Sequence, residues 1–87
     1  MKKTKIYKNP DGTDEVRDEY TENGKFHRID GPAIRIECEL EAWYFEGLLH
    51  RDGNLPAISD YKNKYQAYFE HGVCIKTMIN DEVKFER

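Results

Sequence analysis

Residues 24–33 read G-K-F-H-R-I-D-G-P-A, and residues 47–58 read G-L-L-H-R-D-G-N-L-P-A-I. The first half of this motif recurs at an offset of 23 residues, as from His27 to His50, and its Pro-Ala end recurs at an offset of 24. The second copy therefore carries one extra residue in its turn. A fixed period of this length is typical of repeat architectures, in which each unit is one supersecondary element that cannot bury its apolar face alone.

A third, degenerate copy is indicated nearer the C-terminus. The segment A-Y-F-E-H-G at 67–72 echoes A-W-Y-F-E-G at 42–47, but Ile75 and Lys76 stand in place of His-Arg and no Asp-Gly-Pro follows. A degenerate last unit is typical of a terminal cap. The sequence thus predicts a single domain, residues 1–87, with clear repeats over about 15–33 and 34–57 and a capping repeat over about 58–87.

Short segments between the turns alternate apolar and polar residues, which predicts β-strands. Residues 34–41 alternate without a break and read as one strand, while residues 73–85 read as a hairpin that turns at Asn80 and Asp81. The segment 59–71 is open to two interpretations. Its aromatic residues also have helical spacing, with Ser59 as an N-cap, but the repeat phase favours strand, turn at 62–64, strand. We expect an all-β antiparallel meander, with a short helix at 59–71 as the alternative.

Composition narrows the function classes. The 87 residues carry a net charge of −3, which disfavours direct binding to nucleic acid or to an anionic membrane. No apolar run is long enough to span a membrane, and no apolar region follows the basic start. Cys38 and Cys74 do not form a disulfide framework, so we expect free thiols and a cytoplasmic location.

The pattern of an aromatic pair, Gly, His-Arg and Asp-Gly-Pro-Ala resembles the MORN-like repeat variant of bacteriophage, giant-virus and some bacterial proteins. The resemblance covers about residues 7–76, although Cys38-Glu39 stands where the family usually places Asn-Gly. It implies β-hairpins stacked into an elongated antiparallel sheet and no shared catalytic role. It also implies an interaction module, and for a short viral member an accessory or anti-defence protein in the host cytoplasm.

The repeated polar residues have a structural and a functional interpretation. Side by side, the His and Asp pairs could form a metal site or an acid–base pair. We favour a structural role, because the whole unit repeats and because Asp before Gly caps turns while Arg bridges the carboxylate. No zinc-ligand spacing, activated nucleophile or phosphate-binding loop is present, so no metal, no cofactor and no enzymatic activity are expected. The repeat-structural set is His27, Arg28, Asp30, Gly31, Pro32, His50, Arg51 and Asp52.

Acidic and aromatic positions supply the predicted partner-binding surface. Alternate carboxylates along one strand are either a solvated face, which we favour, or a ridge that imitates a nucleic-acid backbone and fills a basic groove on a partner. The set is Asp14, Asp18, Glu37, Glu39, Glu41, Glu46, Trp43 and Tyr44.

We therefore expect a non-enzymatic protein-binding module that inhibits a host or defence protein with a basic surface. A nucleic-acid-handling effector such as CRISPR–Cas is one example. Open sheet edges would also permit a homodimer. The alternatives are a binder of a nucleotide signal, with Arg28, Arg51 and the His pair as anion ligands, and a plain structural scaffold.

Overall fold

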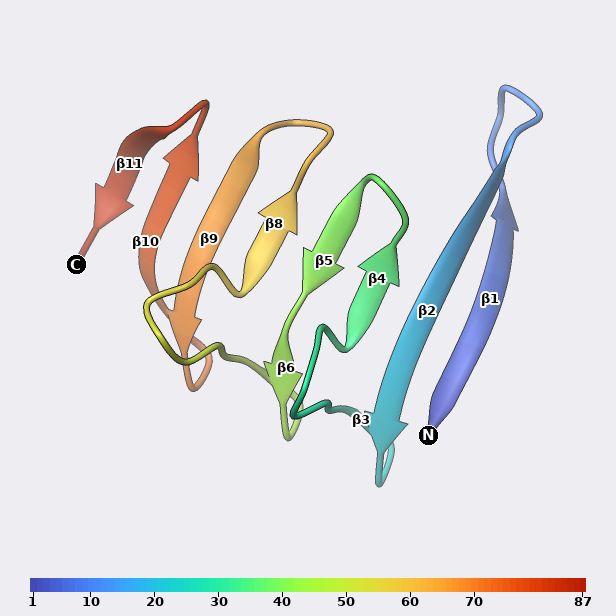
Figure 1. The fold of residues 1–87 in the computed structure, drawn as a ribbon, viewed down its shortest axis with the longest axis horizontal. Helices are drawn as coiled ribbons and strands as arrows, with labels where there is room; N and C mark the ends of the chain where they lie inside the picture. The colour runs from blue at the N-terminus through green and yellow to red at the C-terminus, as the bar shows by residue number, and fades with distance from the viewer.

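The computed structural model describes all of residues 1–87 and consists of strands and turns only (Figure 1). All strand pairs are antiparallel, which confirms the predicted all-β antiparallel fold. The chain forms no helix with the length and hydrophobicity that a membrane crossing requires. The strands are β1 (Lys2–Lys8), β2 (Asp14–Glu22), β3 (Lys25–Phe26), β4 (Ile34–Ile36), β5 (Leu40–Ala42), β6 (Tyr44–Phe45), β7 (Leu48–Leu49), β8 (Ile58–Asp60), β9 (Tyr65–Glu70), β10 (Val73–Ile79) and β11 (Glu82–Glu86).

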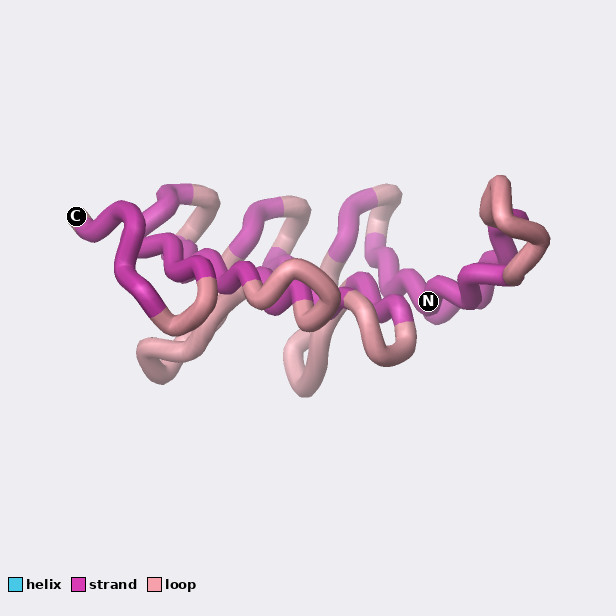
Figure 2. Tube along the Cα trace, turned by 90° about the horizontal axis from the view of Figure 1, so that it is seen from above, coloured by secondary structure: helices cyan, strands magenta, loops and turns pink.

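One sheet contains most of these strands. Its order is β1-β2-β4-β5-β8-β9-β10-β11, with β3 paired to β2, and β6 and β7 form a separate hairpin. Because the order follows the chain, the sheet is a meander and the two termini lie at its opposite edges (Figure 1). The molecule measures 38 × 33 × 17 Å, and Figure 2 shows its strands in one thin layer with loops on both sides.

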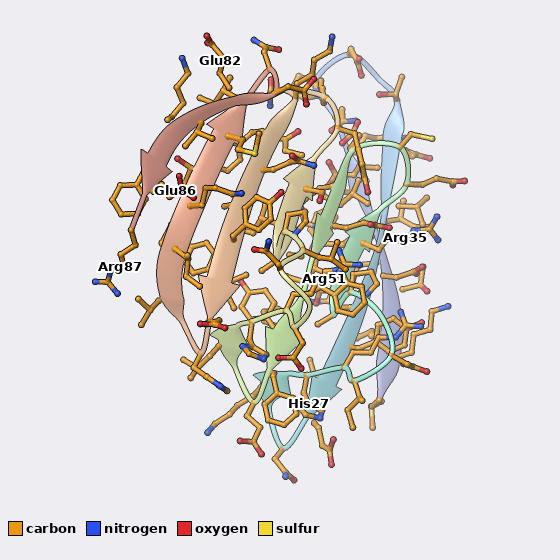
Figure 3. All side chains as sticks on the ribbon, turned by 60° about the vertical axis from the view of Figure 1, so that its left-hand side comes forward. His27, Arg35, Arg51, Glu82, Glu86 and Arg87 are labelled. Atoms are coloured by element: carbon orange, nitrogen blue, oxygen red, sulfur yellow. The ribbon has the colours of Figure 1, made fainter.

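No second layer covers the sheet, and side chains project from both of its faces (Figure 3). The buried apolar residues are accordingly few, and most of them are alanines. Main-chain hydrogen bonds connect these alanines in pairs. Ala33 N–H donates to the Ala42 carbonyl at 2.9 Å, and Ala57 N–H donates to the Ala67 carbonyl at 2.8 Å. The core is thus a narrow band along the line where each repeat loop rejoins the sheet. Its members are Ala33, Ile36, Ala42, Ala57 and Ala67.

The helical alternative for residues 59–71 is wrong. The chain forms β8, a turn over residues 61–64 and β9, as the repeat phase predicts. The Asp60 carboxylate closes this turn by accepting hydrogen bonds from the Asn63 side-chain amide at 2.9 Å and from its backbone N–H at 3.1 Å, and these bonds lower the pKa of Asp60. Tyr65 and Phe69 suggested a helix because residues four apart share a face in a strand as well as in a helix.

The prediction of one continuous strand over residues 34–41 is also wrong. The chain reverses between β4 and β5, with Cys38 at a φ of 61° and a hydrogen bond of 3.0 Å from Glu39 N–H to the Ile36 carbonyl. The register then pairs Ile36 with Leu40. Paired residues share a face of the sheet, so the apolar alternation continues in phase across the reversal and hides it in the sequence.

Each repeat contains a tight hairpin whose two turn residues both have positive φ. The pairs are Asn23-Gly24 (53° and 77°), Glu46-Gly47 (49° and 83°) and His71-Gly72 (48° and 83°). Such turns match the right-handed twist of the strands that they join, and glycine adopts the second position without a steric penalty. Consecutive hairpins are hydrogen-bonded, because Gly47 N–H donates to the Phe26 carbonyl and Gly72 N–H donates to the Leu49 carbonyl, each at 2.8 Å.

We predict that replacing these glycines by alanine destabilises the fold more where neighbouring atoms crowd the new Cβ. Gly24→Ala should lower the free energy of unfolding by about 1 kcal/mol, since only the left-handed backbone is penalised. Gly72→Ala should cost more, because its new Cβ would lie 3.2 Å from a methyl of Leu48, whereas nothing lies within 4 Å at Gly24. Urea unfolding of the two variants tests this, and equal losses would show that the Leu48 contact is unimportant.

Candidate functional site

A cation stacked on an aromatic ring recurs in every repeat. The cation follows its aromatic partner by eight positions each time. Stacking of this kind is worth about 0.5–1 kcal/mol at exposed sites and more where the pair is desolvated. The capping repeat has lost His-Arg but keeps the stack, because Lys76 takes the place of the arginine. The sequence motif alone did not reveal that Lys76 has this role. The stacks are Arg28 over Tyr20 at 3.9 Å, Arg51 over Trp43 at 4.0 Å and Lys76 over Tyr68 at 4.4 Å, measured to the ring centroids.

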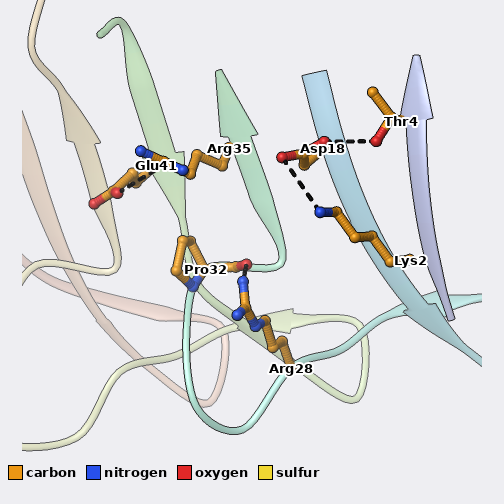
Figure 4. Close-up of polar contacts among 7 residues, drawn as sticks. All are labelled: Lys2, Thr4, Asp18, Arg28, Pro32, Arg35 and Glu41. Atoms are coloured by element: carbon orange, nitrogen blue, oxygen red, sulfur yellow. Dashed lines mark hydrogen bonds and ion pairs between the residues drawn. The ribbon is translucent and has the colours of Figure 1, made fainter. Parts of the chain in front are cut away.

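Both arginines also close the loop that follows them. Arg28 donates from Nη1 to the Pro32 carbonyl at 3.2 Å, as Figure 4 shows, and Arg51 makes the same bond to Pro56 at 3.2 Å. A Cβ on Gly31 would lie 2.7 Å from Cζ of Arg28, so any larger residue here would displace the guanidinium from its present position. The predicted structural role of the Arg and Gly positions has a direct geometric basis in these contacts.

The two copies of the motif use their aspartates differently. Asp30 accepts a hydrogen bond from Arg28 Nε at 3.2 Å, whereas Asp52 lies 2.9 Å from His50 Nε2. Neither carboxylate caps a turn in the way that the sequence suggested. Asp52 directly follows Arg51, whereas Ile29 separates Arg28 from Asp30, and no carboxylate lies within 4.0 Å of the Arg51 guanidinium.

The histidines connect neighbouring repeats. His27 Nδ1 accepts the backbone N–H of Glu46 at 2.9 Å, and His50 Nδ1 accepts that of His71 at 3.0 Å. The hydrogen of each ring must then sit on Nε2. The structure does not bring His27 and His50 together as a pair, because Phe45 lies between them with ring centroids at 4.8 and 6.4 Å. No group of three or more His, Cys, Asp or Glu side chains is placed to hold a metal ion.

These rings form a surface feature that we call the imidazole strip, made of His27, Phe45, His50 and His71, the last two stacked at 4.2 Å. Two open hollows of about 510 and 490 Å³ adjoin along the strip and share Phe45 and His71. Large apolar side chains around them remain exposed, which sequence alternation could not reveal because several lie in loops. They are Ile29 (79% exposed), Leu48 (50%), Leu55 (48%) and Phe45 (38%). The strip, both hollows and these side chains are the loop face.

Three of the predicted acidic contact residues gather elsewhere. Asp14, Glu37 and Glu39 line a hollow of about 260 Å³ together with Glu15. They lie at the β1–β2 and β4–β5 turns, at the end of the strands opposite the β6–β7 turn that carries Glu46 (Figure 1). The acidic turn cluster, as we call these four residues, is therefore not continuous with Glu46.

The remaining acidic residues are engaged within the sheet. Glu41 accepts from the Tyr61 hydroxyl at 2.9 Å and lies 3.7 Å from Arg35 Nε. Asp18 accepts from the Thr4 hydroxyl at 2.8 Å and pairs with Lys2 (Figure 4). The expected ridge of Glu37, Glu39 and Glu41 along one strand does not exist, because the reversal at Cys38 places Glu37 and Glu39 in a turn.

The two predicted aromatic contacts are both half-buried in the structure. Trp43 lies beneath Arg51, so its ring face is already covered on that side. Tyr44 packs against Phe26 with ring centroids 5.3 Å apart. Phe45, which sequence reasoning assigned no role, is the more exposed ring and lies at the centre of the imidazole strip.

Comparison with protein-family models, with curated proteins and with solved structures finds no match to this chain. The functional argument therefore rests on the surface itself. Its exposed apolar groups, stacked aromatic rings and guanidinium groups are suited to holding another molecule by contact.

We predict that the two partners of the Arg28–Asp30 pair contribute unequally to stability. Arg28→Ala should lower the free energy of unfolding by about 1–3 kcal/mol, because the stack on Tyr20 and the bond to Pro32 are both lost. The Asp30 side chain is 86% exposed, so Asp30→Ala should change stability by less than about 0.5 kcal/mol. Thermal and urea unfolding measure both, and a large loss for Asp30→Ala would show that the ion pair, not the stack, holds the loop.

Proposed function

We propose that this chain is a non-enzymatic protein-binding module that contacts its partner with the loop face. The observation that carries the proposal is the gathering of Ile29, Phe45, Leu48 and Leu55, all exposed, around two adjoining hollows. Contiguous exposed apolar surface rimmed by polar groups is typical of interaction sites. The aromatic and arginine content of the surface is that of binding hot spots.

A nucleotide-binding role has weaker support. Such a ligand brings two or more negative charges and needs converging cations. Arg28 is already paired with Asp30, which leaves Arg51 as the guanidinium of the second hollow without a carboxylate partner. Asp52 lines the same hollow and would repel a phosphate.

The MORN-like resemblance extends the proposal to the biological role. We propose that the protein is a phage-type accessory protein that inhibits a host or defence protein. The acidic turn cluster supports a partner with a basic groove, such as a nucleic-acid-handling effector of the CRISPR–Cas type, because opposed charges steer association.

The proposal predicts that a partner is captured through the loop face. Immobilised protein should retain a specific host protein from cell extract, and Ile29→Ser combined with Leu55→Ser should abolish retention. Both side chains are exposed, so the fold should survive. The matched control combines Val83→Ser with Phe85→Ser, which are 50% and 48% exposed and line neither the loop-face hollows nor that of the acidic turn cluster. Equal capture by all three proteins would refute the loop face as the contact surface.

The acidic turn cluster predicts how fast the partner associates. Combined Glu37→Gln and Glu39→Gln changes should slow association several-fold at low salt and flatten its salt dependence, since exposed charges steer encounter and salt screens them. The pair Asp81→Asn and Glu82→Gln, both exposed at the β10–β11 turn and remote from the hollows around Arg51, serves as the control. Association measured by surface plasmon resonance over a range of salt decides this, and unchanged rates would leave the loop face as the sole recognised surface.

A further inference from the structure

Arg51 is the one repeat arginine whose charge is left unneutralised. Arg28 has a carboxylate 3.2 Å from Nε, whereas Asp52, the aspartate of the second copy, is paired with His50. The stack on Trp43 and the bond from Nη1 to Pro56 hold the Arg51 guanidinium in place without cancelling its charge. The hydrogens on Nε and Nη2 have no protein acceptor. A fixed, planar guanidinium with free donors is suited to binding a carboxylate through two hydrogen bonds.

The position of Arg51 makes these donors part of a site. Arg51 lines the second hollow of the loop face, of about 490 Å³, with exposed Ile29 and Leu55 beside it. Arg51 and Leu55 also line a smaller hollow of about 180 Å³ on the other side. Glu70 and Glu86 border that smaller hollow, but neither lies within ion-pair distance of Arg51. The unneutralised guanidinium therefore sits beside two exposed apolar side chains, Ile29 and Leu55.

We propose that Arg51 anchors an acidic side chain of the partner protein, presented beside an apolar residue that packs on Ile29 and Leu55. This inference rests on the protein-binding function proposed above. The charges favour a carboxylate over a phosphate. The second hollow has two cations, of which Arg28 is neutralised by Asp30, and Asp52 adds a negative charge. One free positive charge matches one carboxylate.

The site follows from the position of the aspartate in the second motif. In the first copy Ile29 separates Arg28 from Asp30, whose carboxylate returns to the guanidinium, whereas Asp52 directly follows Arg51. The second copy turns its aspartate to His50 instead. The stack and the bond to the proline carbonyl are the same in both copies. The second loop therefore remains folded although its arginine has no carboxylate partner.

The first experiment selects ligands without knowledge of the partner. A displayed library of random short peptides is panned against the wild-type protein. Enriched peptides should share Asp or Glu next to an apolar residue, and Arg51→Gln should weaken their binding at least about tenfold. Arg35→Gln, the same change at an exposed arginine on β4, should leave affinity unchanged. Peptides without an acidic residue, or equal affinity for Arg51→Gln, would overturn the proposal.

A second pair of variants guards against misfolding of Arg51→Gln. Leu55→Glu places a carboxylate of the protein's own beside Arg51, whereas Leu55→Gln has nearly the same shape without charge. Leu55 is 48% exposed, so both variants should fold. Leu55→Glu should bind the selected peptides several-fold more weakly than Leu55→Gln. Equal affinities would overturn the carboxylate site.

The phosphate alternative and the proposed function are tested separately. Each selected peptide is also made with phosphoserine in place of its acidic residue, and tighter binding of that version would overturn the carboxylate assignment. If the Ile29→Ser and Leu55→Ser protein loses the captured partner while Arg51→Gln keeps it, the protein-binding function stands and the Arg51 inference fails. If neither a partner nor any peptide is retained, both fail.

Discussion

The stack of a cation on an aromatic ring is the interaction on which the rest of this structure depends. A single-layer sheet has no second layer to pack against, so something must hold the loops that follow each hairpin. The arginine guanidinium groups hold these loops. Each lies on an aromatic ring of the sheet, Tyr20 or Trp43, and donates a hydrogen bond to a proline carbonyl in the loop, that of Pro32 or Pro56. The small residues of the motif follow from that geometry. Gly31 leaves room for the guanidinium, and Ala33 and Ala57 are buried where the loop rejoins the sheet.

The histidines extend this local order along the molecule. The imidazoles of His27 and His50 each accept a backbone N–H from the turn of the next hairpin, so each of the two clear repeats contributes an acceptor to its successor. Stability in such an array comes mainly from each unit and its nearest neighbours. The short-range contacts of a meander also favour fast folding for a β-protein, because few distant segments must meet.

Much of this fold could be predicted from sequence because its repeat unit contains residues with strong preferences for turns or strands. Glycines mark the hairpin turns, and the phase of the repeat identified β8 and β9 despite their helical spacing. The alternation alone hid the reversal at Cys38, because Ile36 and Leu40 fall on the same face whether the strand continues or turns back, although the MORN-like pattern places a turn at this position. The functional surface was less accessible to sequence reasoning. The sequence shows acidic residues, but not that Glu41 and Asp18 are engaged by Tyr61, Thr4 and Lys2, nor that Ile29 and Leu55 stay exposed in loops.

The difference between the two arginine loops has a consequence for how such proteins can diversify. In a duplicated module one copy can drift while its sibling preserves the architecture, provided that the drifting copy keeps the contacts that hold it folded. Here the aspartate of the second copy directly follows its arginine and is paired with His50 instead, while the stack and the bond to the proline carbonyl are kept. The arrangement of loop residues thus becomes an adjustable parameter of recognition, separable from folding, and a longer array of such units could display a different chemical group at each step along its surface.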